Sequence, residues 1–158
     1  MTRAPYGDDV AKTMQTLSAE SGNMLHFVLN QQYRSWPYDY VITGDTMVVK
    51  CKEAHYIIPM SVVDNADHFA WDSPQADGSI YKVDGTFGFI SRKAYNDLLQ
   101  NGVFVYDTIT WRKIGETDEY IEVRADIDRT EMRISKTMEL PIVLETKNNP
   151  LGIDWIYE

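Results

Sequence analysis

Apolar and polar positions repeat along this chain with two different periods, one typical of helices and one typical of strands. Within residues 8–33, Val10, Met14 and Leu17 recur at steps of four and three, and an apolar stripe continues to the end of the segment. Pro37 disfavours helical geometry in the residue before it. Ser21-Gly22-Asn23 interrupts the pattern, so we expect an amino-terminal helical segment that is either two short helices or one long helix with a weak point there, and that ends before Pro37.

After Pro37 the pattern predicts three consecutive strands, over residues 40–43, 46–51 and 55–63. The first two flank Gly44-Asp45, which suits a type II′ hairpin turn because glycine accepts a positive φ at the first central position. Pro59 lies within the third strand and cannot donate a hydrogen bond to a ladder. We expect that strand to lie at an edge, to be bulged, or to stop near Pro59.

A long stretch without periodicity, residues 64–78, separates these strands from a predicted hairpin and a predicted helix. Strands over 79–83 and 86–90 flank Asp84-Gly85, the strongest hairpin signal in the chain. The helix over 92–101 has Ser91 as its amino-terminal cap and Gly102 as a left-handed stop.

The remaining apolar positions predict strands over residues 103–111, 120–127, 132–134, 140–144 and 153–157. Their short links favour antiparallel pairing, because parallel neighbours need long crossovers. We therefore predict one α+β domain over residues 1–158, with a predominantly antiparallel sheet of about six or more strands. The amino-terminal helical segment and the helix over 92–101 should pack on one face of this sheet.

The composition is that of an ordinary globular protein, with 158 residues of which 44% are hydrophobic and 25% charged. A chain of this length can bury enough surface without a disulfide or a structural metal. Cys51 is the single cysteine, which excludes an intramolecular disulfide. The sequence has no apolar run typical of a signal peptide or a membrane span, so we expect a soluble, cytoplasmic protein.

The formal net charge of −9 changes the expected class of partner. Nucleic acids and anionic membranes bind surfaces with clustered Lys and Arg, so neither is expected to bind this acidic chain. An acidic surface instead permits a basic protein or a cation, and it also confers solubility.

Candidate metal ligands are concentrated in the irregular stretch, at Asp64, Asp67, His68 and Asp72. Carboxylates are ligands for calcium, magnesium or manganese, and a histidine beside them favours manganese, iron or zinc. Their spacing matches neither an EF-hand nor a zinc-protease motif. Aspartates that form the turns of a solvated loop explain the same residues.

Aromatic residues give a second interpretation of this stretch. Trp71 lies in a polar context that strand alternation does not explain, and Asp72 follows it. Aromatic side chains commonly anchor protein interfaces, and exposed carboxylates accelerate association with a basic surface. Trp71 and Asp72 are therefore candidate partner-binding residues.

Two further arrangements would support catalysis. Cys51 and His55 flank a short break and are candidate cross-strand neighbours, as a nucleophile and its base require. Glu122, Asp126 and Asp128 are candidate paired carboxylates for glycoside hydrolysis, although they also fit a solvated strand face. The chain has no glycine-rich phosphate loop or nucleotide fingerprint, so we expect no cofactor.

Two classes of function follow from these observations. The first is a non-enzymatic acidic module that binds a basic protein, such as an inhibitor or an immunity-like protein. The second is a small hydrolase or metal-dependent enzyme with a site built around residues 55–77. Because the sequence contains no complete catalytic set, the first is preferred.

Overall fold

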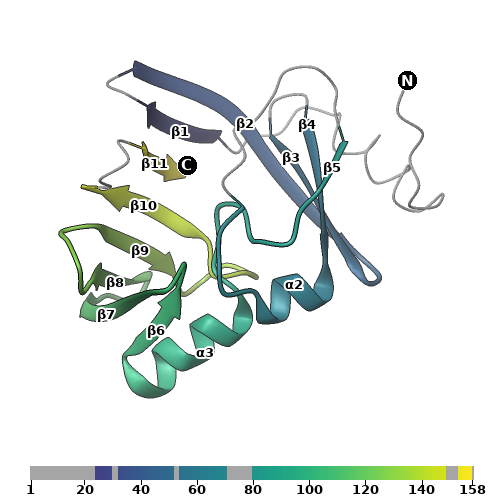
Figure 1. The fold of residues 1–158 in the computed structure, drawn as a ribbon. Helices are drawn as coiled ribbons and strands as arrows, with labels where there is room; N and C mark the ends of the chain where they lie inside the picture. The colour runs from purple at the N-terminus through teal and green to yellow at the C-terminus, as the bar shows by residue number, and fades with distance from the viewer. Residues whose placement is uncertain (1–23, 30–31, 52–53, 71–79, 149–152, 158) are drawn as a thin grey trace.

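The computed structural model describes residues 24–29, 32–51, 54–70, 80–148 and 153–157. These residues form a strand-rich α+β fold (Figure 1). The strands are β1 (Met24–Leu29), β2 (Gln32–Thr43), β3 (Thr46–Cys51), β4 (Ala54–Pro59), β5 (Ile80–Lys82), β6 (Val103–Tyr106), β7 (Ile109–Glu116), β8 (Tyr120–Ala125), β9 (Glu131–Ser135), β10 (Val143–Lys147) and β11 (Ile153–Tyr157). The helices are α2 (Met60–Asn65) and α3 (Arg92–Asn101).

The strands are hydrogen-bonded in the order β5-β4-β3-β2-β1-β11-β10-β9-β8-β7-β6. Neighbouring strands are antiparallel, except that β4 and β5 are parallel. The predicted α+β class with a mostly antiparallel sheet is therefore confirmed. The carboxyl-terminal strand β11 lies in the middle of this order, between β1 and β10.

The long strand β2 belongs to both halves of the sheet. Its residues 32–37 pair with β1, and its residues 38–43 pair with β3 on the other side (Figure 1). Pro37 is the last residue that pairs with β1, opposite Met24. A proline, which has no N–H to donate, thus lies where the strand changes partner.

The predicted amino-terminal helix is wrong for residues 24–29 and 32–33. Residues 24–29 form β1, and β2 begins at Gln32. The Met24–Leu29 run is apolar at nearly every position, and such a run fits a central strand as well as it fits a helix. Pairing with β2 on one side and β11 on the other favours the strand. Residues 8–23 of the predicted segment lie outside the described residues.

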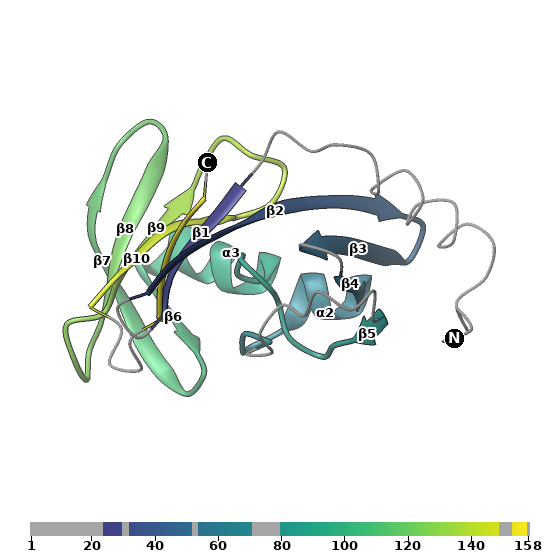
Figure 2. The same ribbon diagram turned by 90° about the horizontal axis from the view of Figure 1, so that it is seen from above.

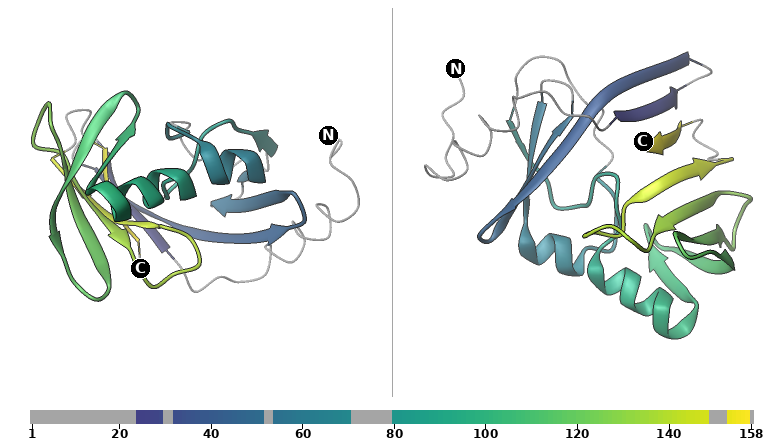
Figure 3. Two further views of the ribbon diagram at one scale, coloured as in Figure 1. Left: turned by 90° about the horizontal axis from the view of Figure 1, so that it is seen from below. Right: turned by 180° about the vertical axis from the view of Figure 1, so that it is seen from behind.

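Helices α2 and α3 lie side by side on the inner side of the curved sheet (Figure 2), and both further views show them on that side (Figure 3). The predicted helix over 92–101 is confirmed with both of its ends. Ser91 Oγ accepts a hydrogen bond from the Ala94 N–H at 3.2 Å. Gly102 has a φ of 69° and donates its N–H to Leu98 O at 2.9 Å. Ala94 and Leu98 are buried in the core.

The predicted third strand ends at Pro59, and residues 60–63 form helix α2 instead of continuing the strand. Pro59 is the cap residue of that helix, with φ −57° and ψ 146°. A proline fits here because the first N–H groups of a helix have no partner within the helix. Pro59 is therefore both the last residue of β4 and the start of α2.

The predicted strand over 103–111 is a hairpin, in which Tyr106 pairs with Ile109. The two-residue turn consists of Asp107 and Thr108, which have φ values of 54° and 60°. Two positive φ values in succession are the pattern of a type I′ turn, which matches the twist of the flanking strands. Threonine is β-branched and rarely adopts a positive φ, so the sequence pattern did not indicate this turn.

The predicted hairpin at Asp84-Gly85 is absent. Strand β5 pairs in parallel with β4, and Thr86 forms an isolated parallel bridge with Phe69. Gly85 allows a close approach of two loops: a Cβ at this position would lie 2.7 Å from Ala70 N and 2.9 Å from His68 O. The glycine is thus needed for backbone contact rather than for a turn.

Other predicted elements are confirmed within the described residues. Gly44 has a φ of 57° at the turn between β2 and β3. Strands β8, β9, β10 and β11 occupy four of the predicted regions, although β10 begins at Val143 rather than at Leu140. No helix in the described part of the chain is long and apolar enough to span a membrane.

Candidate functional site

Three loops meet beside helix α2: residues 66–70, residues 83–86, and the turn at Asp107 and Thr108. The first two are joined by backbone hydrogen bonds, from Ala70 N–H to Thr86 O at 2.8 Å and from Thr86 N–H to His68 O at 3.2 Å. The turn is joined to the first loop because the Asp107 N–H donates to the Asp67 carbonyl oxygen at 2.8 Å. Residues from three distant parts of the sequence therefore form one surface.

The imidazole of His68 lies between two carboxylates of these loops. Its Nδ1 is 2.9 Å from Asp67 Oδ1, and its Nε2 is 3.2 Å from Asp84 Oδ1. Ionised carboxylates only accept hydrogen bonds, so the ring can donate to both of them only in its doubly protonated form. We call Asp67, His68 and Asp84 the His68 cluster.

The electrostatics of the His68 cluster agree with this geometry. The hydrogen bond to Asp67, and then that to Asp84, raises the pKa of His68 above its ordinary value of 6.5. The same hydrogen bond lowers the pKa of Asp67 below its ordinary value of 3.8. The side chains of Asp67 and Asp84 are 87% and 94% exposed, so water screens these ion pairs strongly.

A buried hydrogen-bond network connects these loops to the core. The Tyr106 hydroxyl lies 2.5 Å from Thr86 Oγ1 and accepts a hydrogen bond from the Ser91 N–H at 3.2 Å. Burial raises the pKa of Tyr106 to about 12, so this hydroxyl keeps its proton. The ring of Tyr106 packs edge-on against Phe69, with centroids 4.7 Å apart. The conformation of the surface loops is thus tied to the core.

A groove of about 650 Å³ borders the His68 cluster. Its apolar lining residues are Pro59, Val62, Phe69, Ala70 and Val83. Lys82 and Asp84 are its charged lining residues. Small-molecule and peptide-side-chain sites commonly have volumes of this size, with mostly apolar walls and a few polar groups.

Of the predicted metal ligands, the structure brings Asp67 and His68 into contact but gives Asp64 a different partner. Asp64 forms an ion pair with Arg92 at 3.0 Å, whereas Asp67 contacts His68. Asp72 lies outside the described residues, as does Trp71. Across the described ranges, no group of three or more His, Cys, Asp and Glu side chains is placed to hold a metal ion. A metal site that includes Asp72 remains a prediction.

Sequence reasoning missed Asp84 and Asp107 as members of this surface. Asp84 was recognised only as part of a turn signal, and Asp107 as part of a strand. Both reach the site through contacts with residues distant in sequence, which no local pattern reveals. The one available signal was the irregular stretch itself, since loops of this kind tend to carry function.

The arrangements considered for catalysis do not gain support. The register pairs His55 with Lys50, and Cys51 with Ala54, so the predicted cross-strand pairing of Cys51 and His55 is wrong. The predicted pairing differs from the observed register by one residue. A shift of one residue is enough to move a side chain to the opposite face of a strand.

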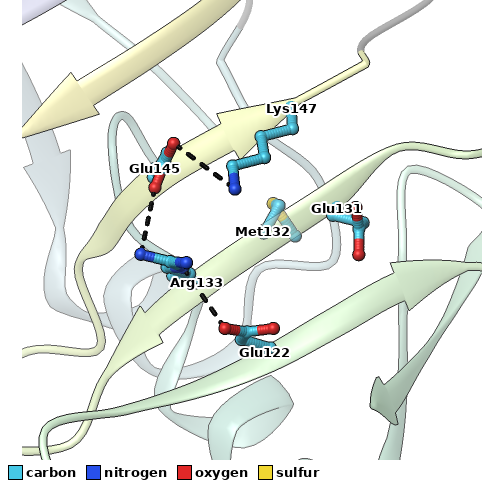
Figure 4. A pocket seen from close by; sticks show the side chains of 6 residues that line it. All are labelled: Glu122, Glu131, Met132, Arg133, Glu145 and Lys147. Atoms are coloured by element: carbon cyan, nitrogen blue, oxygen red, sulfur yellow. Dashed lines mark ion pairs between the residues drawn. The ribbon is translucent and has the colours of Figure 1, made fainter. Parts of the chain in front are cut away.

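Glu122 and Asp126 each form ion pairs with arginines of neighbouring strands. Arg133 lies between Glu122, at 3.4 Å, and Glu145, at 3.3 Å, and Lys147 contacts Glu145 from the other side (Figure 4). Asp126 is held by Arg112 at 2.9 Å. These contacts match the solvated strand face that the alternating pattern indicated.

Comparison with known proteins does not assign a family or a function to this chain. Among protein-family models, curated proteins and solved structures, no match to this chain was found.

Proposed function

We propose that this chain is a non-enzymatic acidic module that binds a basic protein, in the manner of an inhibitor or immunity-like protein. The observation that carries the proposal is the apolar groove bordered by the His68 cluster. The groove supplies contact area for an apolar side chain, and the carboxylates supply attraction for Lys or Arg beside it.

The apolar part of the groove is suited to one anchoring side chain of a partner. Phe69 is 5% exposed and Val83 is 7% exposed, so the walls are fixed by the core rather than free to collapse. Anchors that fill such pockets account for most of the affinity in protein interfaces. Trp71 follows Ala70 in the sequence, and we propose Trp71 as an aromatic contact to the partner.

The charge beside the groove favours a basic partner. Asp67, Asp84 and Asp107 contribute three carboxylates from the three loops, and one imidazole lies between two of them. Lys82 is the cation that lines the groove itself. The net charge of the chain, −9, has the same sign as the cluster and extends the attraction to longer range.

The contacts of His68 support binding over catalysis. A general base needs a ring nitrogen directed at the proton that it removes. Both ring nitrogens of His68 are within hydrogen-bond distance of carboxylate oxygens instead. The imidazole therefore bridges two loops through its two ring nitrogens.

Selection of a random displayed dodecapeptide library against the folded chain tests this proposal. We expect enriched peptides to combine Lys or Arg with a large apolar residue. Synthetic copies should bind with an affinity that Val62→Glu lowers about tenfold or more, because a charge then enters the apolar groove. Association should slow with salt, since surface charges are screened over about 10 Å at 0.1 M.

The matched control is Lys147→Gln, which removes a half-exposed charge from β10, away from the groove, and breaks its ion pair with Glu145. It should leave peptide affinity unchanged within about twofold. Trp71→Ala should speed dissociation, and Asp72→Asn should chiefly slow association. Enrichment of acidic peptides, or binding that is insensitive to Val62→Glu, contradicts the proposal.

A further inference from the structure

Strand β6 is the last strand at one end of the sheet, and its pairing with β7 determines where its backbone groups point. The turn at Asp107 and Thr108 makes Tyr106 and Ile109 the hydrogen-bonded pair next to it. Hydrogen-bonded pairs recur at every second residue along an antiparallel ladder, and the bond from Lys113 N–H to Gly102 O, at 2.9 Å, lies where this alternation places one. Phe104 therefore bonds to β7, whereas the N–H and C=O groups of Val103 and Val105 point away from it.

The outer edge of β6 has no neighbouring strand within the described part of the sheet. Natural edge strands are usually protected by charged residues, proline or a bulge. Val103–Tyr106 contains no charged residue and no proline, and its pairing with β7 is regular. The strand thus presents two residues whose backbone groups are oriented for a further strand.

Exposed apolar side chains lie on β6 and on the helix that precedes it. Val105 is 56% exposed, although its neighbours Phe104 and Tyr106 are buried. Leu99, in the last turn of α3 before Gly102 and β6, is 52% exposed. An added strand with apolar side chains at alternate positions would cover Val105 and form backbone hydrogen bonds at once.

The charges at the two ends of β6 differ. Arg112 pairs with Val103 at the start of the strand, and its guanidinium is held by Asp126 at 2.9 Å. At the other end the strand runs into Asp107, whose N–H is bonded to Asp67 of the His68 cluster. A segment added along β6 therefore ends beside carboxylates.

We propose that β6 is a docking edge for an extended segment of a partner protein, with apolar residues at alternate positions and Lys or Arg at the end that reaches Asp107. This inference rests on the proposed function, because it identifies the conformation in which the basic partner presents part of its chain. The Asp107 N–H points to the same outer side, where the Asp67 carbonyl oxygen accepts its hydrogen bond, so the open part of the edge is Val103–Val105 and it ends at the His68 cluster.

Amide hydrogen exchange of the free, dilute protein tests the edge without any ligand. Phe104 and Tyr106 should exchange slowly, whereas Val103 and Val105 should exchange rapidly because their N–H groups face solvent. Slow exchange at Val103 and Val105 in the monomer would overturn the proposal. Slow exchange that appears only at high concentration, together with dimers in sedimentation, would identify a second copy as the occupant instead.

The probe for docking is the peptide acetyl-KVTVKK-amide, titrated to several millimolar while backbone amide shifts are recorded. We expect shifts centred on β6 and new exchange protection at Val103 and Val105. The charge-reversed peptide acetyl-EVTVEE-amide should bind about fivefold or more weakly. No shift in β6 at the highest peptide concentration overturns the proposal.

Two changes separate backbone docking from simple charge attraction. Val105→Pro removes an outward N–H at an edge position and should weaken peptide binding about fivefold or more, whereas Val105→Thr should change it less than about twofold. Only every second N–H of a docked peptide faces β6. N-methylation of those residues should abolish binding, whereas N-methylation of the residues between them should not. This test leaves the protein unchanged. Equal effects of both methylated peptides contradict docking on the edge.

The result also distinguishes this inference from the proposed function. A basic peptide that shifts Val62 and Ala70 but not β6 supports the groove and overturns the docking edge. Equal binding of the basic and acidic peptides to β6 overturns both the basic partner and the basic extended segment proposed for this edge.

Discussion

The hydroxyl groups of Tyr106 and Thr86 lie 2.5 Å apart in the core and join strand β6 to the loop that carries Asp84. Tyr106 also accepts the Ser91 N–H, so one phenol connects β6, this loop and the amino terminus of α3. Both partners are fully buried. The packing of the loops around the His68 cluster on the core therefore depends on this hydroxyl.

Tyr106→Phe should lower the free energy of unfolding by about 1–3 kcal/mol, because the buried Thr86 hydroxyl and Ser91 N–H lose their shared partner. Urea denaturation of both proteins measures the difference. The control is Tyr95→Phe, on the half-buried side of α3, which should change stability by no more than about 0.5 kcal/mol. Equal effects of the two substitutions would show that the network contributes nothing specific.

The His68 cluster should make stability depend on pH in a defined window. The pKa of His68 is raised in the folded state, so its contribution is fully present below its ordinary value of 6.5. That contribution is lost as the pH rises through the higher folded value. The pKa of Asp67 is lowered, so its contribution is present above 3.8 and is lost as the pH falls through the lower folded value.

The stability difference between the wild type and His68→Gln should therefore decrease as the pH rises from 6.5 through the higher folded pKa of His68. Urea unfolding across this range measures it, and the carbon-bound proton signals of His68 report its pKa directly. Asp84→Asn should move that pKa back toward 6.5, because it removes the second hydrogen-bonded carboxylate. A His68 that titrates at or below 6.5 in the folded wild type would contradict the cluster.

Gly85→Ala should lower the free energy of unfolding by at least about 2 kcal/mol, because the new methyl group meets backbone atoms that cannot rotate away. Its Cβ would lie 2.8 Å from the Phe69 carbonyl carbon as well as 2.7 Å from Ala70 N. The matched control is Gly115→Ala, whose Cβ would find only ordinary contacts with Glu122, the nearest at 3.7 Å. That control should be neutral or stabilising by up to about 1 kcal/mol.

Thr108→Gly should raise the free energy of unfolding by about 0.5–1 kcal/mol. Glycine accepts a φ of 60° without steric cost, and this gain exceeds its entropic cost and the loss of the Thr108 hydroxyl bond to Asp107 O. Thr110→Gly, in the adjacent extended strand, is the control and should be destabilising. Thermal unfolding of both variants decides between them, and a destabilised Thr108→Gly would show that the turn carries no strain.

Local signals in the sequence predicted the elements whose ends are defined by neighbouring residues. Ser91 and Gly102 fix helix α3 through bonds that span three or four residues, and Gly44 fixes its turn in the same way. Strand β1 could not be predicted with equal success. It is a strand because of β11, and Leu25 pairs with Tyr157 across nearly the whole described chain.

The candidate site was predictable only in part, for the same reason. Asp67 and His68 are adjacent in sequence, and the irregular stretch around them drew attention to both. Their partners Asp84 and Asp107 arrive through the close approach at Gly85 and the unusual turn at Thr108. No local sequence pattern indicates that Gly85 permits a close contact or that Thr108 adopts a positive φ.

The central place of β11 also has a consequence for how this chain acquires its structure. Strands β1 and β10 cannot be joined until residues 153–157 have been synthesised and inserted between them. Pairings of such large sequence separation form slowly, because the entropy of closing a long loop is lost before any contact is gained. During synthesis the facing edges of β1 and β10 therefore stay open, and this interval is when the nascent chain is most exposed to aggregation and to capture by chaperones.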